Sequence, residues 1–243
     1  MKSFLLIIIL IFAGQTLGSL AGVIKKPPDS FLRFSLAFAA SMMLSISFMQ
    51  LIPESLKVTA FSNVIAGLFL GIILMGLIDK MLPHINPELG KKEKPAIERT
   101  ITMLVIGMAL HNLPEGLAVG IGFAMTSKLG IIIALGIALQ DLPENIATIV
   151  PLYGINKNRL KSFLIVMTTV FFELIGFIIG YYLFKDSNLI FLGISLSFAA
   201  GCMIYISVEE LTPKLHVLLP VSFHLITPPV SIKSPEPPAA SLS

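Results

Sequence analysis

The sequence has little charge for its length, and this scarcity excludes most soluble proteins. Only 13% of its 243 residues are Asp, Glu, Lys or Arg, whereas 55% are hydrophobic. Soluble domains usually carry about a quarter charged residues. The net charge of +3 does not indicate a nucleic-acid partner, because the basic residues fall in short segments between apolar runs. Those runs are about as long as the 20 residues that cross a bilayer, so we predict a multi-pass membrane protein surrounded by lipid.

Two further absences narrow the chemistry. The single cysteine, Cys202, excludes a disulfide within the chain, and we expect it to be a small buried apolar residue. The His-Glu-x-x-His pattern of many zinc hydrolases is also missing. We therefore predict no enzyme activity, no catalytic residue and no catalytic cofactor.

Seven apolar runs predict seven membrane-spanning helices and an all-α fold. They cover residues 3–24, 31–52, 62–82, 101–123, 129–152, 162–184 and 188–208. The first run resembles a signal peptide, but it is long for one and lacks a clear cleavage site, so a span is favoured. We expect a single transmembrane domain over 1–213, with its central helices at about 101–152. A solvated loop should lie at about 83–100, followed at the C-terminus by a disordered Pro- and Ser-rich tail over 214–243.

Basic residues between the runs predict the orientation. Eleven lie in or beside the segments after the first, third and fifth runs. Four lie at the N-terminus and after the second, fourth and sixth runs. Because Lys and Arg accumulate on the cytoplasmic side, we predict a cell-membrane protein with its N-terminus outside.

Two similar polar turns interrupt the fourth and fifth runs. Residues 109–116 read ALHNLPEG, and residues 138–145 read ALQDLPEN, 29 residues later. With their flanking residues, six of ten positions are identical. Ionisable groups at membrane depth are costly and usually mark an ion or substrate path. One such turn is compatible with a structural kink, but two in neighbouring, opposed helices favour a site.

A second repeat relates the second run to the seventh. Residues 35–53 and 195–213 are identical at ten of nineteen positions, with a constant offset of 160. The two copies are five spans apart, so they cross the membrane in opposite directions. Both repeats therefore predict one pseudo-two-fold axis in the membrane plane around the central helix pair, an arrangement of many secondary transporters. The repeat also predicts an eighth span near 222–242, but prolines there break any helix.

Helical geometry gathers the polar side chains of each turn. Residues i, i+3 and i+4 share a helix face. The two faces that result hold His111, Asn112 and Glu115 in the first copy and Gln140, Asp141 and Glu144 in the second. Pro114 and Pro143 lack an N–H, so each also leaves a backbone carbonyl without its helical donor.

This set of groups suits a divalent cation. Glu115 and Glu144, facing each other at low dielectric, would repel and each would tend to hold a proton. A divalent ion that binds both removes this cost. Mixed oxygen and nitrogen ligands favour Zn²⁺, Fe²⁺ or Mn²⁺, with Cd²⁺ as a further candidate, over Cu⁺. Glu173 in the sixth run is either a further ligand or a protonated partner in a helix–helix hydrogen bond.

The two Pro-Glu turns, HNLPEG and QDLPEN, resemble those of the ZIP (Zrt/Irt-like) family of divalent-metal transporters, most closely its GufA-like branch. Residues 198–211 resemble the seventh helix of that family. The resemblance implies an eight-helix fold with both termini outside, a homodimer as in many members, and uptake of zinc or iron toward the cytoplasm. It also implies two ion positions. One would be formed by His111, Glu115, Gln140 and Glu144, and the other by Asn112, Asp141, Glu144, Glu115 and Glu173.

Three differences separate the chain from the family pattern. Gln140 stands where many members have His, Asn145 stands where many have Gly, and Gln50 replaces a common Glu. The missing eighth helix is a larger difference than any of these. Two alternatives to a transporter therefore stay open. One is an intramembrane metal-dependent hydrolase, and the other is a truncated paralogue that binds metal without transporting it.

Overall fold

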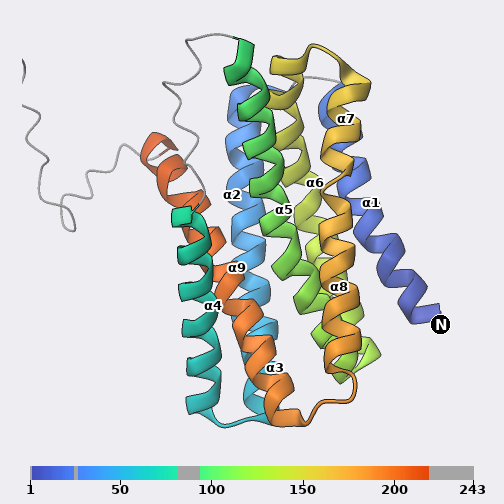
Figure 1. The fold of residues 1–243 in the computed structure, drawn as a ribbon, viewed down its shortest axis with the longest axis vertical. Coiled ribbons are helices and arrows are strands. Elements are labelled where there is room, and N and C mark those ends of the chain that lie inside the picture. The colour runs from blue at the N-terminus through green and yellow to red at the C-terminus, as the bar shows by residue number, and fades with distance from the viewer. Residues whose placement is uncertain (1, 25–26, 82–93, 219–243) are drawn as a thin grey trace, which may run out of the picture.

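The computed structural model describes residues 2–24, 27–81 and 94–218, and these form a bundle of antiparallel helical rods (Figure 1). The elements are α1 (Lys2–Ile24), α2 (Asp29–Ile46), the π-helix η1 (Ser47–Leu51), α3 (Ile52–Val58), α4 (Phe61–Met81), α5 (Lys94–Met125), α6 (Ser127–Asn156), α7 (Arg159–Met167), α8 (Val170–Phe184) and α9 (Leu189–Leu218). Because α2, η1 and α3 form one rod and α7 and α8 another, the described residues form seven rods, which match the predicted spans in number, and six of them are long and apolar enough to cross a membrane. The described residues contain no strand.

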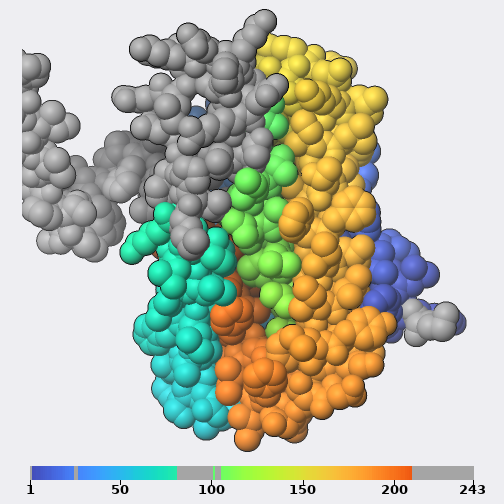
Figure 2. All heavy atoms as spheres, in the orientation of Figure 1, coloured from blue at the N-terminus to red at the C-terminus, as the bar shows by residue number. Residues whose placement is uncertain are grey.

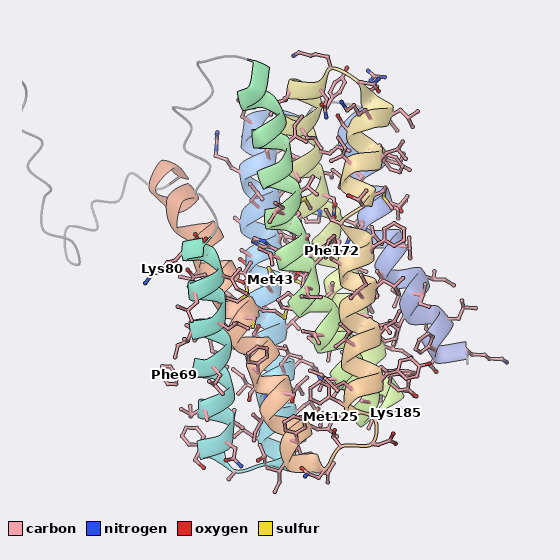
Figure 3. All side chains as sticks on the ribbon, viewed as in Figure 1. Met43, Phe69, Lys80, Met125, Phe172 and Lys185 are labelled. Carbon is pink, nitrogen blue, oxygen red and sulfur yellow. The ribbon has the colours of Figure 1, made fainter. Side chains whose placement is uncertain are left out.

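The distribution of polar and apolar side chains is that of a membrane bundle. In the part of the chain that the structure describes, every rod except α5 is long and apolar enough to cross a membrane. Phe69 points outward from α4 and is 58% exposed, whereas Met43 lies among the helices in the interior (Figure 3). Glu115 and Glu173 are fully buried. Apolar groups outside and charged groups inside are expected when the solvent is lipid.

The central rod α5 is enclosed by its neighbours. It packs against α6, α8 and α9, and on the face shown in Figure 2 it appears as a strip between α4 and α8. A single residue, Thr126, joins α5 to α6, and its hydroxyl accepts a hydrogen bond from the backbone N–H of Leu129 at 3.1 Å. This N-cap begins α6 immediately after α5 ends. The two helices that carry the Pro-Glu turns are therefore held side by side and antiparallel.

Two rods differ from the simple spans that the sequence predicts. The sixth span is broken at Thr168 and Thr169, whose hydroxyls donate to the carbonyls of Ile165 and Val166 at 2.6 and 2.8 Å. Such bonds compete with the helical hydrogen-bond ladder. The second span widens into η1 just before Pro53 and continues to Val58. Proline crowds the preceding turn, and the wider π turn gives its ring room.

Some predicted boundaries also shift. α5 begins at Lys94, inside the loop expected at about 83–100, and Pro95 suits the first turn of a helix. α9 continues to Leu218, so residues 214–218 are helical instead of part of the predicted tail. The remainder of that tail and the eighth span expected near 222–242 lie outside the described residues.

The packing follows the predicted inverted repeat. α2 packs on α6 and α9 packs on α5, as a two-fold axis exchanging α2 with α9 and α5 with α6 requires. The same exchange relates the contact between α1 and α6 to that between α8 and α5. The small residues of the repeat are buried. These are Ala39, Ala40, Ala199, Ala200 and Gly201.

Glycines bring α5 and α8 into backbone contact beside the first Pro-Glu turn. A β-carbon added to Gly116 would overlap the carbonyl oxygen of Glu173, and one added to Gly176 would overlap the carbonyl oxygen of Leu113. Small residues allow this close approach between membrane helices. The backbone of Glu173 is thereby held against the turn that carries Glu115.

We predict different effects on stability for two glycine-to-alanine substitutions in α5. Gly116→Ala should lower the thermal midpoint of unfolding in detergent, because overpacking costs about 1–3 kcal/mol. Gly107→Ala is the matched control, since a β-carbon there meets nothing within 4 Å. It should leave the midpoint unchanged or raise it slightly, as Ala favours helix over Gly. Equal midpoints for the two variants would contradict the proposed contact.

Candidate metal site

Three carboxylates from the two Pro-Glu turns meet in the bundle interior. Glu115 comes from α5, and Asp141 and Glu144 come from α6. Each offers an oxygen, and these oxygens lie within 4.8 Å of one another. All three side chains are at least 95% buried. The helix faces expected from the sequence are therefore brought together by the antiparallel α5–α6 pair.

Gln140 joins this group through an amide hydrogen bond. Its Nε2 donates to Oε1 of Glu115, across the α5–α6 contact, and the side chain is fully buried. The bond orients the amide, since only its NH₂ end is a donor. The Oε1 of Gln140 is buried and has no hydrogen-bond partner among the described residues.

Glu173 approaches the same region from α8. Its side chain is fully buried, and its charge interacts with those of Glu115, Asp141 and Glu144. It lies in the first turn of α8, just after the break in the sixth span. The N-terminal end of a helix dipole is positive and favours negative charge. The break therefore places the positive end of α8 beside a buried carboxylate. The sequence predicted Glu173 as a candidate but did not predict the break.

Asn112 and His111 differ in their placement. Asn112 is buried, and its Nδ2 donates to the carbonyl of Thr169 at 3.1 Å, at the break between α7 and α8. His111 is half-buried, and its Nδ1 lies 2.6 Å from the carbonyl of Gly107 one turn earlier. Among the described residues, His111 and Glu173 fall outside the group of oxygens within 4.8 Å.

The first helix adds polar groups that the sequence analysis did not select. Gln15 and Ser19, one turn apart on α1, are both fully buried. The Nε2 of Gln15 donates to Oε2 of Glu173 at 2.5 Å, and the hydroxyl of Ser19 lies 3.5 Å from Oδ1 of Asn145. A glutamine in the middle of an apolar span is itself a signal of function, and that signal was available in the sequence.

Several buried oxygens in the site remain without donors. Oδ2 of Asp141 and Oε1 of Glu173, like the Oε1 of Gln140, have no hydrogen-bond partner among the described residues. Buried acceptors normally have a partner. Zinc holds oxygen ligands at about 2.0–2.2 Å, so two ligands on one ion are at most about 4.4 Å apart. A small inward movement of the carboxylates would therefore create a zinc-binding geometry.

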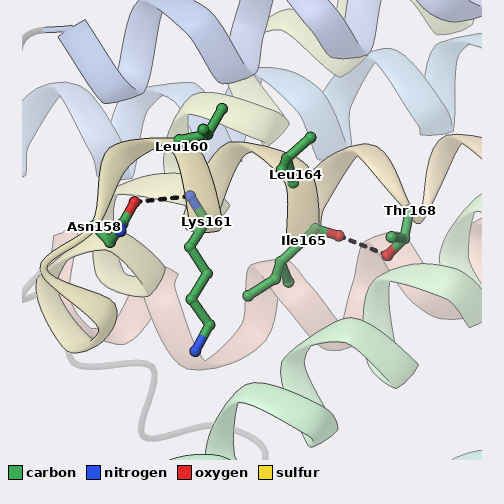
Figure 4. A pocket seen from close by; sticks show the side chains of 6 residues that line it. All are labelled: Asn158, Leu160, Lys161, Leu164, Ile165 and Thr168. Carbon is green, nitrogen blue, oxygen red and sulfur yellow. Dashed lines mark hydrogen bonds between the residues drawn. The ribbon is translucent and has the colours of Figure 1, made fainter.

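Other polar and sulfur-containing residues lie elsewhere. Cys202 is buried in the apolar core, as predicted, and so are Met43 and Met203. A hollow on the surface of α7 has a mostly apolar lining (Figure 4). Its lining residues are Asn158, Leu160, Lys161, Leu164, Ile165 and Thr168. Because none of them is a carboxylate, a thiol or an imidazole, the hollow is not a candidate metal site.

Known proteins share this pattern. The profile of a family described as ZIP zinc transporter matches residues 91–220. Proteins named zinc transporter ZupT, from Enterobacter sp. (strain 638), Escherichia coli O7:K1 (strain IAI39 / ExPEC) and Escherichia coli (strain K12 / DH10B), are each 35% identical over 218 residues. Each alignment covers 86% of this chain and 85% of the relative.

These similarities include both Pro-Glu turns and most of the bundle. They accord with a multi-pass helical protein and with the carboxylate group in its interior. They also favour a transporter over the intramembrane hydrolase that the sequence left open. The chain belongs to the ZIP family of zinc transporters.

Proposed function

We propose that this protein carries Zn²⁺ across the membrane through the carboxylate group of α5 and α6. The observation that supports this most strongly is the meeting of Glu115, Asp141 and Glu144 inside a lipid-facing bundle, with oxygens within 4.8 Å of one another. Three buried negative charges at this spacing repel, and a divalent cation relieves the repulsion. The relatives named zinc transporters make Zn²⁺ the first ion to test.

The ligand set extends beyond these three carboxylates. We propose that His111, Asn112, Gln140 and Glu173 complete it as the ion or ions move through the bundle. Oxygen and nitrogen ligands also accommodate Fe²⁺, Mn²⁺ and Cd²⁺, so we expect these ions to compete with zinc. Transport requires that an ion bind and then leave, which favours exchangeable and incomplete coordination.

Zinc influx into proteoliposomes tests this function. We expect Glu144→Ala to reduce zinc influx by at least about 10- to 100-fold, because Glu115 loses the carboxylate that faces it. Loss of a residue that only supports a metal ligand already lowers metal affinity or activity by about 10- to 100-fold. Glu115→Ala should behave alike. Glu54→Ala is the matched control, since Glu54 pairs with Lys57 at 2.7 Å on α3, away from the Pro-Glu turns.

Near-normal influx in Glu144→Ala would defeat the proposed site. If wild-type protein binds zinc but gives no influx, the chain is an incomplete carrier, as the alternative of a truncated paralogue holds. Cleavage of a membrane peptide or lipid that depends on Glu115 would instead support the hydrolase.

We propose a cell-membrane orientation with the N-terminus outside, so that zinc moves toward the cytoplasm. The motivation is the excess of basic residues in the segments at the opposite end of the bundle. We also propose that a single domain over residues 1–213 contains the whole zinc path. The resemblance to the family also motivates a homodimer, which chemical crosslinking in membranes can detect.

Thiol labelling of intact cells tests this orientation. In a Cys202→Ser background, Lys128→Cys at the start of α6 should react with a membrane-impermeant maleimide. Lys161→Cys on α7 should react only after lysis, because it lies at the other end of the bundle. Both lysines are exposed, so access and not burial decides the result. The reverse labelling pattern would invert the proposed orientation.

We further propose alternating access, with α1, α5, α6 and α7–α8 moving as one unit against α2–α3, α4 and α9. Within each proposed unit the helices pack through pairs such as α1 with α6 and α4 with α9. The end of the Ile46 side chain in α2 lies against the backbone of Gly136 in α6, across the boundary between the units.

A crosslink across this boundary should therefore slow transport. In the Cys202→Ser background, bridging Ile46→Cys to Gly136→Cys with a short bifunctional thiol reagent should reduce zinc influx severalfold. The matched control bridges Gly122→Cys to Ile133→Cys, a contact between α5 and α6 inside one unit. Unchanged influx after complete crosslinking of Ile46→Cys to Gly136→Cys would argue against movement at this boundary.

A further inference from the structure

Gln15 in α1 is a buried polar residue outside both Pro-Glu turns. Its side chain is fully buried, and its Nε2 donates to Oε2 of Glu173 at 2.5 Å. The two residues are 158 positions apart in the sequence. An amide buried at membrane depth is costly unless it is hydrogen-bonded, and here its donor meets a carboxylate that faces the proposed zinc path.

Gln15 and Glu173 occupy equivalent places in their helices. Residues 15–22 of α1 follow the pattern Gln-x-x-Gly-x-x-x-Gly, and residues 173–180 of α8 follow the pattern Glu-x-x-Gly-x-x-x-Gly. The offset between the two segments is 158, which is also the separation of the hydrogen-bonded pair. The sequence identity is too low to reveal this relation by itself.

Backbone packing supports the equivalence. Gly18 lies against the carbonyl of Leu142 in α6, and Gly176 lies against the carbonyl of Leu113 in α5. Leu142 and Leu113 are equivalent leucines of the two Pro-Glu turns, 29 residues apart. Each glycine therefore docks its helix on the same position of its own central helix.

The next glycine in each helix repeats the correspondence. Gly22 meets Ile146 in α6, and Gly180 meets the carbonyl of Leu117 in α5. Ile146 and Leu117 are again 29 residues apart. Two successive contacts thus relate α1 on α6 to α8 on α5 by the inverted repeat, and the axis passes between Gln15 and Glu173.

We propose that Gln15 is a positioning residue of the zinc path, which holds the carboxylate of its symmetry mate Glu173 in a fixed orientation. The inference rests on the proposed function. The amide occupies Oε2 of Glu173 and leaves Oε1 for the ion, since Oε1 is buried without a hydrogen-bond partner among the described residues. Glu173 would then present one oxygen to zinc instead of two.

The carboxylate sets the direction of this amide. A carboxylate that binds zinc is ionised and only accepts hydrogen bonds, so the NH₂ end of Gln15 faces Glu173 in the zinc-bound protein. The other end, Oε1, lies 3.5 Å from the hydroxyl of Thr169 at the break between α7 and α8. Outer-shell hydrogen bonds of this kind orient ligands, and their removal typically weakens metal binding by about 10- to 100-fold.

A double-mutant cycle on the full chain in detergent tests the proposal. The substitutions are Gln15→Met, which keeps the side-chain length and removes the donor, Glu173→Ala, and both together. Co²⁺ serves as a spectroscopic probe, and Zn²⁺ affinity is measured by competition. Gln15→Met alone should weaken Zn²⁺ binding by about 10- to 100-fold and alter the Co²⁺ ligand-field spectrum. In the Glu173→Ala background it should change affinity by no more than about twofold.

The matched control is Thr16→Val, the adjacent residue of α1, whose hydroxyl lies 3.7 Å from Sδ of Met167. It should leave both readouts as in the wild type. Equal losses from Gln15→Met in both backgrounds would show a merely structural role and overturn the proposal, as would wild-type binding and spectrum in Gln15→Met. Failure of the proposed function can be distinguished from failure of this inference. If the protein does not transport zinc, wild-type protein would bind Zn²⁺ without influx into proteoliposomes, and the double-mutant cycle would still report on Gln15.

Discussion

Repulsion among buried carboxylates is the constraint that shapes this bundle. Glu115, Asp141, Glu144 and Glu173 are all buried, and oxygens of the first three lie within 4.8 Å of one another. At low dielectric, such charges are costly to hold together without a cation. Under the proposed function, a divalent ion bound among these carboxylates would relieve this repulsion, and that relief would contribute to its affinity. The protein must supply enough packing elsewhere to hold the groups in place.

That packing comes largely from close backbone contact. Gly116 and Gly176 bring α5 onto α8, and Gly18 brings α1 onto α6. In lipid, helices gain little from hydrophobic burial against each other, so close van der Waals contact between small residues takes its place. The inverted repeat uses this device twice, once for each central helix. As a result, two outer helices direct Gln15 and Glu173 toward the same point.

Discontinuities in the outer helices complete the polar environment. The break at Thr168 and Thr169 frees a backbone carbonyl that Asn112 contacts, and it also begins α8 just before Glu173. Non-helical backbone at membrane depth is tolerated where protein covers it. Under the proposed function, the amides and hydroxyls around the carboxylates would give partial and exchangeable contacts, which suit an ion that must leave again. A hydrolytic zinc would instead need a fixed site with an open water position.

The sequence alone determined the membrane class, the seven spans and the candidate ligands at the two Pro-Glu turns. Apolar run length sets the number of spans, and the repetition of the Leu-Pro-Glu motif in neighbouring helices marks Glu115 and Glu144. Helical spacing also predicts that Gln140 and Asp141 share a face with Glu144, because residues three or four apart lie on one side of a helix. The inverted repeat of α2 and α9 could likewise be detected in the sequence, since the two copies share enough identical residues.

Tertiary structure alone decided which groups meet across helices. Gln15 and Glu173 are 158 residues apart, and no local periodicity brings them together; the glycine contacts of α1 and α8 do so. The break in the sixth span depends on threonine hydroxyls competing for backbone carbonyls, a choice that short-range sequence rules leave open. His111 shares a helix face with Glu115, yet it lies outside the 4.8 Å group formed by the carboxylates among the described residues. Sequence specifies the face of a helix, but the distance between two faces is set only when the helices pack.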